Sequence, residues 1–149
     1  MIHRQFLGFD TSKIKDFFVI HNVKLRIYVT HNTWGVNDYI YIIKTTYNRA
    51  NADYQAHHNQ ETTCGVLTYN TVNDGGLNRY YDIPLTDLSI VIKNGTTKIG
   101  LRDTNDNGDI DPASGGNKNP PFTFQRQVDA NPPQLVINYS ADNHPIFVD

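Results

Sequence analysis

The side chains best suited to chemistry lie in a polar loop that begins at Asp103, directly after an alternating apolar segment. Acidic and amide side chains recur there at every second position, and Gly108 then permits a sharp turn. This spacing lets successive oxygens of one turning loop point at a common centre, as a hard cation such as Ca²⁺ requires. The sequence therefore predicts a structural calcium site. Its predicted ligands are Asp103, Asn105, Asn107, Asp109 and Asp111.

The same loop has a second interpretation as a turn without a metal. Ser114 occupies the position where a bidentate Glu would close the calcium shell, and Pro112 follows the loop where a helix would be needed. Asp and Asn side chains also favour turns, because they bond to nearby backbone N–H groups. Both interpretations stay open at this point. If the loop binds calcium, we expect the ion to hold the loop in place rather than to switch it.

A second group of candidate residues is aromatic and basic. Residues 23–30 alternate strictly, and their polar face carries two cations and a tyrosine. Residues 38–47 place two more tyrosines on a strand that we expect to be a neighbour. Sugar rings stack on such aromatic faces, and cations suit acidic glycans. Alternatively, the tyrosines only pack against other residues of a sheet. The predicted ligand-binding residues are Lys24, Arg26, Tyr28, Trp34, Tyr39 and Tyr41.

No constellation of residues indicates catalysis. His57 and His58 are adjacent, so on a strand they would point in opposite directions, and no carboxylate lies at ligand spacing. Cys64 is the one cysteine, which excludes an internal disulfide and a cysteine-based zinc site. A single Glu weakens two-carboxylate glycosidase chemistry, and no nucleophile elbow occurs. We therefore predict that the protein is not an enzyme.

The composition of the chain argues against several classes of binding partner. The formal net charge is −2 and only 19% of the 149 residues are charged, which argues against binding to nucleic acid or membranes by bulk electrostatics. No apolar run reaches membrane-spanning length, so we expect no membrane insertion, and the first residues form no signal-peptide pattern. The chain is then either released by another route or is part of a longer polypeptide.

The elements that must position these residues are strands. Fourteen Asp against one Glu, together with seventeen Asn, favour turns over helices. Period-two patterns predict an all-β, antiparallel β-sandwich of jelly-roll type with about seven or eight strands. Residues 1–140 form one domain in this interpretation, and residues 141–149 form a tail. The expected strands are 4–9, 23–30, 38–47, 78–83, 97–102, 122–127 and 134–139, with short helical turns expected within 85–92 and 51–58.

The opening segment also carries a family resemblance. Residues 4–14, RQFLGFDTSKI, resemble the R-x-F-L-x-F-D-T-S-x-I segment of DNRLRE-type jelly-roll modules, which are related to alginate-binding carbohydrate-binding modules. Residues 23–29, VKLRIYV, are similar to the strand that follows it in that family. The resemblance covers roughly residues 4–140. It implies a non-catalytic binding or adhesion module, located outside a cell, at a cell surface or on a virion, with a polysaccharide as ligand.

One departure from the family suggests an alternative function. Members of the family carry one or two further strands before this segment, whereas only three residues precede it here. A sheet that lacks its first strand exposes an unpaired edge, and such an edge can pair with another chain. The alternative is therefore a structural protein of a virion or of a self-assembling surface filament. In it, a neighbouring copy or a parent polypeptide completes the sheet.

Overall fold

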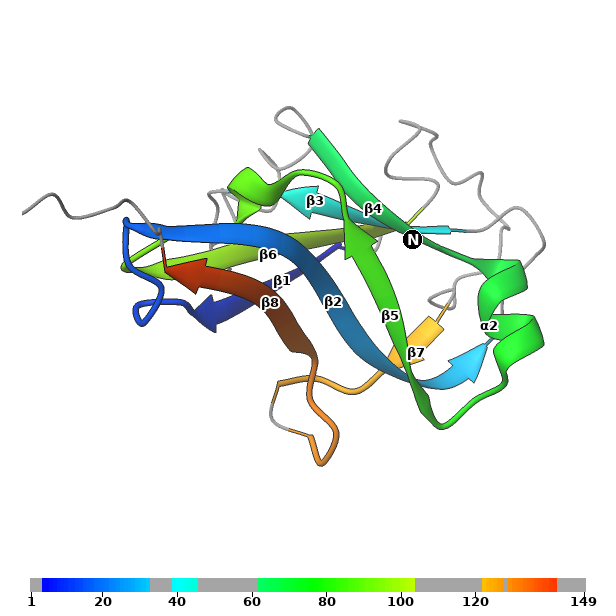
Figure 1. The fold of residues 1–149 in the computed structure, drawn as a ribbon. Coiled ribbons are helices and arrows are strands. Elements are labelled where there is room, and N and C mark those ends of the chain that lie inside the picture. Colours follow the sequence, from blue (N-terminus) through cyan, green and yellow to red (C-terminus); the bar gives the residue numbers. More distant parts are fainter. Residues whose placement is uncertain (1–3, 33–38, 46–61, 104–121, 128, 142–149) are drawn as a thin grey trace, which may run out of the picture.

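Two antiparallel sheets face each other in the computed structural model, which describes residues 4–32, 39–45, 62–103, 122–127 and 129–141 (Figure 1). The strands are β1 (Arg4–Asp10), β2 (Phe18–Asn32), β3 (Tyr39–Lys44), β4 (Thr62–Thr68), β5 (Arg79–Leu85), β6 (Thr96–Asp103), β7 (Phe122–Phe124) and β8 (Gln134–Ala141). One sheet has the order β1–β6–β3–β4. In the other, β2 pairs with β5 on one side and with β8 and β7 on the other. The expected antiparallel β-sandwich is thus confirmed.

Two short helical elements interrupt the strands. The 3₁₀-helix η2 (Leu88–Ile90) confirms the helical turn expected within residues 85–92. The helix α2 (Tyr69–Gly75) was not expected, because seven residues are too short for a helical repeat to be visible. The Thr68 side chain caps its start, and Gly76, with φ of 86°, ends it. The other expected turn, residues 51–58, lies outside the described residues.

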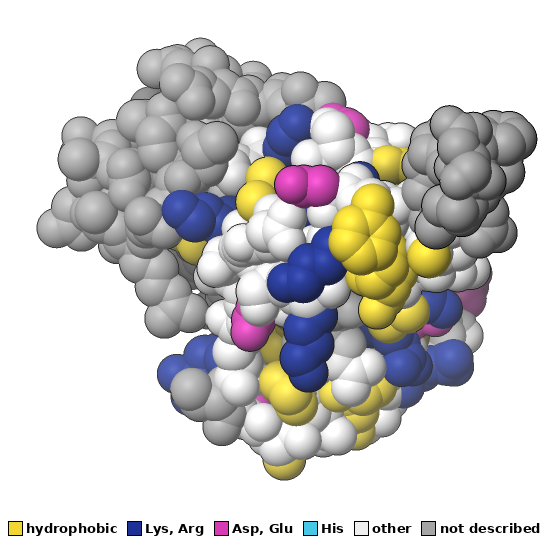
Figure 2. Space-filling view, turned by 60° about the vertical axis from the view of Figure 1, so that its left-hand side comes forward, with side chains coloured by type: hydrophobic (Ala, Val, Ile, Leu, Met, Phe, Trp, Pro, Cys, Tyr) yellow, Lys and Arg dark blue, Asp and Glu magenta, His cyan; other side chains and the backbone are white. Residues whose placement is uncertain are grey.

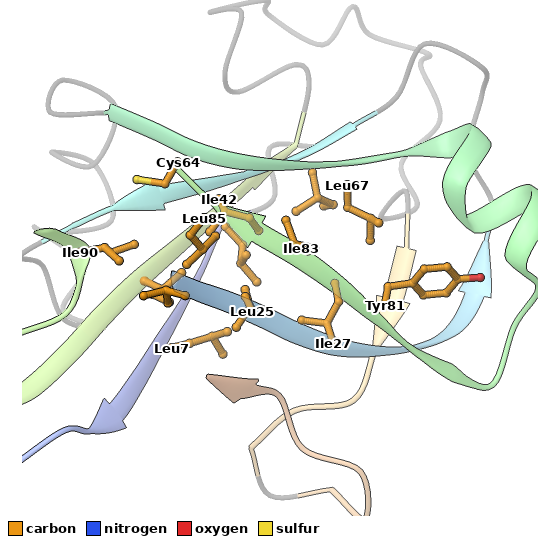
Figure 3. Close-up of a cluster of buried hydrophobic side chains, with 14 of the residues drawn as sticks. Leu7, Leu25, Ile27, Ile42, Cys64, Leu67, Tyr81, Ile83, Leu85 and Ile90 are labelled. Atoms are coloured by element: carbon orange, nitrogen blue, oxygen red, sulfur yellow. The ribbon is translucent and has the colours of Figure 1, made fainter. Parts of the chain in front are cut away.

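The core forms between the inner faces of the sheets, and β2 lies at its centre (Figure 3). The side chains of Leu25, Ile27 and Val29 have no exposed surface, whereas the residues between them are partly exposed. This confirms the alternation expected for residues 23–30. Full burial of one such side chain stabilises the fold by about 1.5–3 kcal/mol. The facing sheet contributes Leu7, Ile40, Ile42, Cys64, Leu67, Ile99 and Leu101.

The two sheets are in direct contact where β4 lies beside β5. The carbonyl oxygen of Cys64 accepts hydrogen bonds from the backbone N–H and the hydroxyl of Thr86, at 2.8 and 3.1 Å. A Cβ atom at Gly65 would lie 2.9 Å from the carbonyl oxygen of Pro84. Glycine is therefore required at this position, because a side chain would push β4 away from β5.

At one end of the sandwich, hydrogen bonds join the residues that follow β1 to the segment that connects η2 with β6. The hydroxyls of Thr11 and Thr97, both buried, lie 2.9 Å apart. The Thr11 hydroxyl also donates to the carbonyl oxygen of Ile92, while the Ile92 N–H donates to the Thr97 hydroxyl at 2.9 Å. The Asp10 carboxylate accepts a hydrogen bond from the backbone N–H of Ser12 at 3.0 Å. The residues that carry the family resemblance therefore have structural roles.

The buried threonine pair generates the first prediction. Thr11→Val should lower the free energy of unfolding by about 1–3 kcal/mol, because it leaves buried polar partners without a hydrogen bond. Urea denaturation followed by circular dichroism measures this loss. Thr96→Val, at an exposed position of β6, is the matched control and should change the free energy by less than about 0.5 kcal/mol. Equal effects of the two substitutions would contradict this role of the threonine pair.

Candidate functional site

The predicted ligand-binding residues do not form one face. Lys24, Arg26 and Tyr28 lie on the outer face of the sheet that contains β2. Tyr39 and Tyr41 lie on β3, which pairs with β4 and β6 in the other sheet. The prediction that the two tyrosine-bearing strands are neighbours was therefore wrong. The physical reason is that alternation shows which side of a strand is apolar but not which sheet the strand joins.

Several predicted residues lie outside the described part of the chain. This holds for Trp34 and for the calcium ligands Asn105, Asn107, Asp109 and Asp111. Of Asp103 only the backbone is described, at the end of β6 and opposite Ile40 of β3. The calcium site therefore stays a prediction. Within the described ranges, no three His, Cys, Asp or Glu side chains come close enough to hold a metal ion.

Lys24, Arg26 and Tyr28 belong to a larger polar surface, which we call the sheet platform. It consists of Lys24, Arg26, Tyr28, Tyr80, Asp82 and Gln134, contributed by β2, β5 and β8. Register explains the assembly, since Arg26 is opposite Asp82 on one side and opposite Gln134 on the other. The Asp82 carboxylate lies 3.0 Å from Lys24 Nζ and 2.7 Å from Arg26 Nε. Gln134 Oε1 accepts from Arg26 Nη1 at 3.1 Å.

Two aromatic rings complete the platform. The Tyr28 and Tyr80 rings meet edge to face with centroids 5.2 Å apart. The Arg26 guanidinium carbon lies 4.8 Å from the Tyr80 ring centroid, and the Tyr80 hydroxyl donates to the carbonyl oxygen of Pro132 at 3.0 Å. These contacts fix the orientation of both rings. Tyr80 and Asp82 were not among the predicted ligand-binding residues, although the alternation of YYDIPL places them on the face of β5 opposite to its buried residues.

The electrostatics of the platform centre on Asp82. Partial burial raises the pKa of this carboxyl, but hydrogen bonds and charge attraction from Lys24 and Arg26 together outweigh burial and hold the pKa below its ordinary value. Asp82 is therefore ionised at neutral pH. Two cations share one carboxylate, so the platform keeps a positive excess while each side chain is held in place.

These ion pairs predict how stability depends on pH. Because the folded-state pKa of Asp82 is lowered, the pairs stabilise the fold above the ordinary value of 3.8, and this contribution is lost as the pH falls through the lowered pKa. Asp82→Asn should lower the free energy of unfolding by less than about 1 kcal/mol at neutral pH, since the partners are solvent-accessible.

Urea midpoints measured at neutral and at strongly acidic pH test this expectation. The difference between the wild type and Asp82→Asn should disappear in acid, where the wild-type carboxyl is also neutral. Asp74→Asn removes one exposed carboxylate of α2 and serves as the matched control. A difference for Asp82→Asn that stays constant with pH would contradict the ion-pair account.

A second surface, which was not predicted from the sequence, lies at the end of the sandwich where β2 begins. We call it the end surface. It consists of the exposed apolar side chains of Phe17, Leu88, Ile92 and Tyr139, together with Lys13, Lys15 and Lys93. A shallow depression of about 510 Å³ lies here between Asp16 and Ile20 on one side and η2 with the residues after it on the other. Figure 2 turns this end forward and shows apolar side chains lying beside Lys and Arg side chains.

A β-bulge explains why Val19, next to Phe18 in the chain, is also exposed but lies on the outer face of the sheet. In the β2–β8 pairing, Ile20 is opposite Tyr139 and Asn22 is opposite Asn138, so His21 is an extra residue. The extra residue reverses the alternation, which turns Phe18 and Ile20 toward the core and leaves Val19 outside. The signal in the sequence is the run FFVI, because four consecutive apolar residues cannot all be buried by one strand.

The titratable and nucleophilic groups near these surfaces show no catalytic arrangement in the described residues. His21 Nε2 lies 2.7 Å from the hydroxyl of Ser140, and both residues are exposed. Burial raises the pKa of the Cys64 thiol, which keeps it protonated and weakly nucleophilic at neutral pH.

Comparison with known proteins adds no relative: no family model, no curated protein and no solved structure matches this chain. The resemblance to DNRLRE-type modules stays a prediction that depends on the residues quoted above. Among the helices that the structure describes, none has the length and apolar character needed to span a membrane.

Proposed function

We propose that this protein is a non-catalytic binding or adhesion module that acts outside the cell or on a virion and binds carbohydrate on the sheet platform. The observation that carries this proposal is the fixed set of Lys24, Arg26, Asp82 and Gln134 beside the Tyr28 and Tyr80 rings. Sugar hydroxyls both donate and accept hydrogen bonds. The platform offers cationic donors, a carboxylate acceptor and an amide that can do either.

Preorganisation makes this face suitable for a ligand as polar as a sugar. Each long side chain that becomes ordered on binding costs about 0.5–1.5 kcal/mol of binding free energy. Asp82 already holds Lys24 and Arg26, and Pro132 already holds the Tyr80 hydroxyl, so much of this cost is met on folding. The positive excess of the platform supports an acidic polysaccharide as the ligand, which is also what the family resemblance implies.

The platform proposal predicts that binding depends on one sheet and not on the other. Tyr28→Ala should raise the Kd about two- to tenfold, because an aromatic contact contributes about 0.5–1.5 kcal/mol. A glycan array identifies the ligand, and isothermal titration calorimetry with that glycan measures the Kd. Tyr41→Ala, on β3 of the opposite sheet, is the matched control and should leave the Kd unchanged. Equal effects of the two substitutions would contradict the platform as the site.

The calcium site is proposed as a separate, structural feature of the loop that follows β6. A ligand that binds only the folded chain stabilises it by about 2.7 kcal/mol at a concentration one hundred times its Kd. The melting temperature should therefore be higher in calcium than in chelator, and Asn107→Ala should reduce this increase. Asn70→Ala, at an exposed position of α2, should not reduce it. An unchanged melting temperature for the wild type would refute the calcium site.

The alternative function, a structural protein completed by a strand from a neighbour, requires a β1 edge that is available for pairing. Gln127 Nε2 donates to the carbonyl oxygen of Gly8 in β1 at 2.6 Å, so part of the hydrogen-bonding capacity of this strand is used within the chain. An incoming strand would have to compete with this contact. This hydrogen bond favours the binding module over the structural protein.

A further inference from the structure

The end surface exposes more apolar area than a solvated loop requires. Phe17 is 61% exposed, Ile92 46% and Tyr139 43%. Phe17 and Phe18 meet with ring centroids 4.7 Å apart, and Phe18 lies 5.1 Å from Tyr139, so the aromatic residues form one cluster. Exposed apolar clusters with a polar rim mark interaction surfaces. The sheet platform is separate, since it lies on the outer face of β2, β5 and β8.

Within the part of the chain that the structure describes, the lysines around this cluster form no ion pair. Lys93 Nζ donates to the backbone carbonyl oxygens of Asp16 and Phe18, at 3.1 and 2.7 Å. Lys15 Nζ donates to the carbonyl oxygen of Ser12 at 2.8 Å. These acceptors orient the ammonium groups without neutralising them, because a carbonyl carries no net charge.

The nearby carboxylates have other partners. Asp16 Oδ1 accepts from the Asn94 side chain at 2.8 Å, and Asp10 Oδ1 accepts from the Ser12 N–H at 3.0 Å. The lysines are thus held by uncharged acceptors and the carboxylates by uncharged donors. Lys44 Nζ and Asp87 Oδ1 also belong to this end, since both lie 2.6 Å from Ser89 Oγ in η2. With these and Lys13 included, this end carries four lysines against three carboxylates. A partner that binds here must supply negative charge and an apolar phase together.

We propose that the end surface docks onto an anionic lipid membrane surface. Aliphatic side chains such as Leu88 and Ile92 offer no flat ring to a sugar, but they bury favourably at the boundary between head groups and acyl chains. Lysines beside them attract anionic head groups. The interaction is peripheral and reversible. It goes beyond carbohydrate binding and does not depend on it.

Vesicle co-sedimentation of the full chain tests the proposal. The chain should bind vesicles made of equal parts phosphatidylserine and phosphatidylcholine, and it should not bind phosphatidylcholine alone. Phe17→Ala should lower the partition coefficient about tenfold or more, since burial of a Phe side chain in an apolar phase raises a partition coefficient by about that factor. Replacing Lys13 and Lys15 by Gln should lower it about fivefold for each lysine.

Leu77→Ala is the matched control, because Leu77 is 44% exposed and lies next to α2, at the opposite end of the sandwich in Figure 1. It should leave vesicle binding unchanged, and thermal melts should show that every variant is folded. Equal binding of Phe17→Ala and Leu77→Ala overturns the proposal, as does an absence of vesicle binding by the wild type. If light scattering shows that the chain self-associates through Phe17 without binding vesicles, the end surface contacts another copy, and the proposal is likewise wrong.

Discussion

The structure depends on the strict alternation of residues along the middle of β2. Over residues 23–29 one side of this strand is fully apolar and buried, while the other side carries Lys24, Arg26 and Tyr28. One strand therefore supplies both the centre of the core and the centre of the polar platform. A shift of register by one residue would exchange the two faces, which the burial of Leu25 and Ile27 makes prohibitively unfavourable. The core thus fixes the orientation of the platform residues.

The alternation fails at both ends of β2, and each failure has a consequence. The bulge at His21 reverses the two faces, so Phe18 and Ile20 continue the core while Val19 is exposed. The strand pairs with β8 up to Arg26 and with β7 from Val29 onward, and a second irregularity lies between Val29 and His31 within the β7 pairing. Bulges bend a strand and increase its twist. A strand of 15 residues can therefore serve two partners along one edge and still cover the core.

The sequence was most informative where a pattern depends on neighbours along the chain. The alternation in β2 and the turn at η2 are local, and both were predicted correctly. Which strands pair with one another is not a local property of the sequence. Tyr39 and Tyr41 were therefore assigned to the sheet of Tyr28, whereas they lie in the other sheet. The strand β4 was missed because Gly65 and a bulge interrupt its alternation, which lets Cys64 and Leu67 both face the core. Tyr80 and Asp82 were visible in the pattern of β5, but only the register opposite Tyr28 and Arg26 gives them a shared role.

The two surfaces use their charges in opposite ways, and this difference separates their partners. On the platform, Asp82 binds Lys24 and Arg26 directly, so a ligand meets groups that are already ordered and that keep a positive excess. Such a face selects by hydrogen-bond geometry as well as by charge, because each polar group is held in a fixed position. At the end surface, uncharged carbonyl groups hold Lys15 and Lys93, and the charge remains available beside exposed Phe17. Attraction there depends on charge and apolar area, neither of which demands a defined partner geometry. A face of the first kind suits a ligand with fixed stereochemistry, and one of the second kind suits a fluid interface.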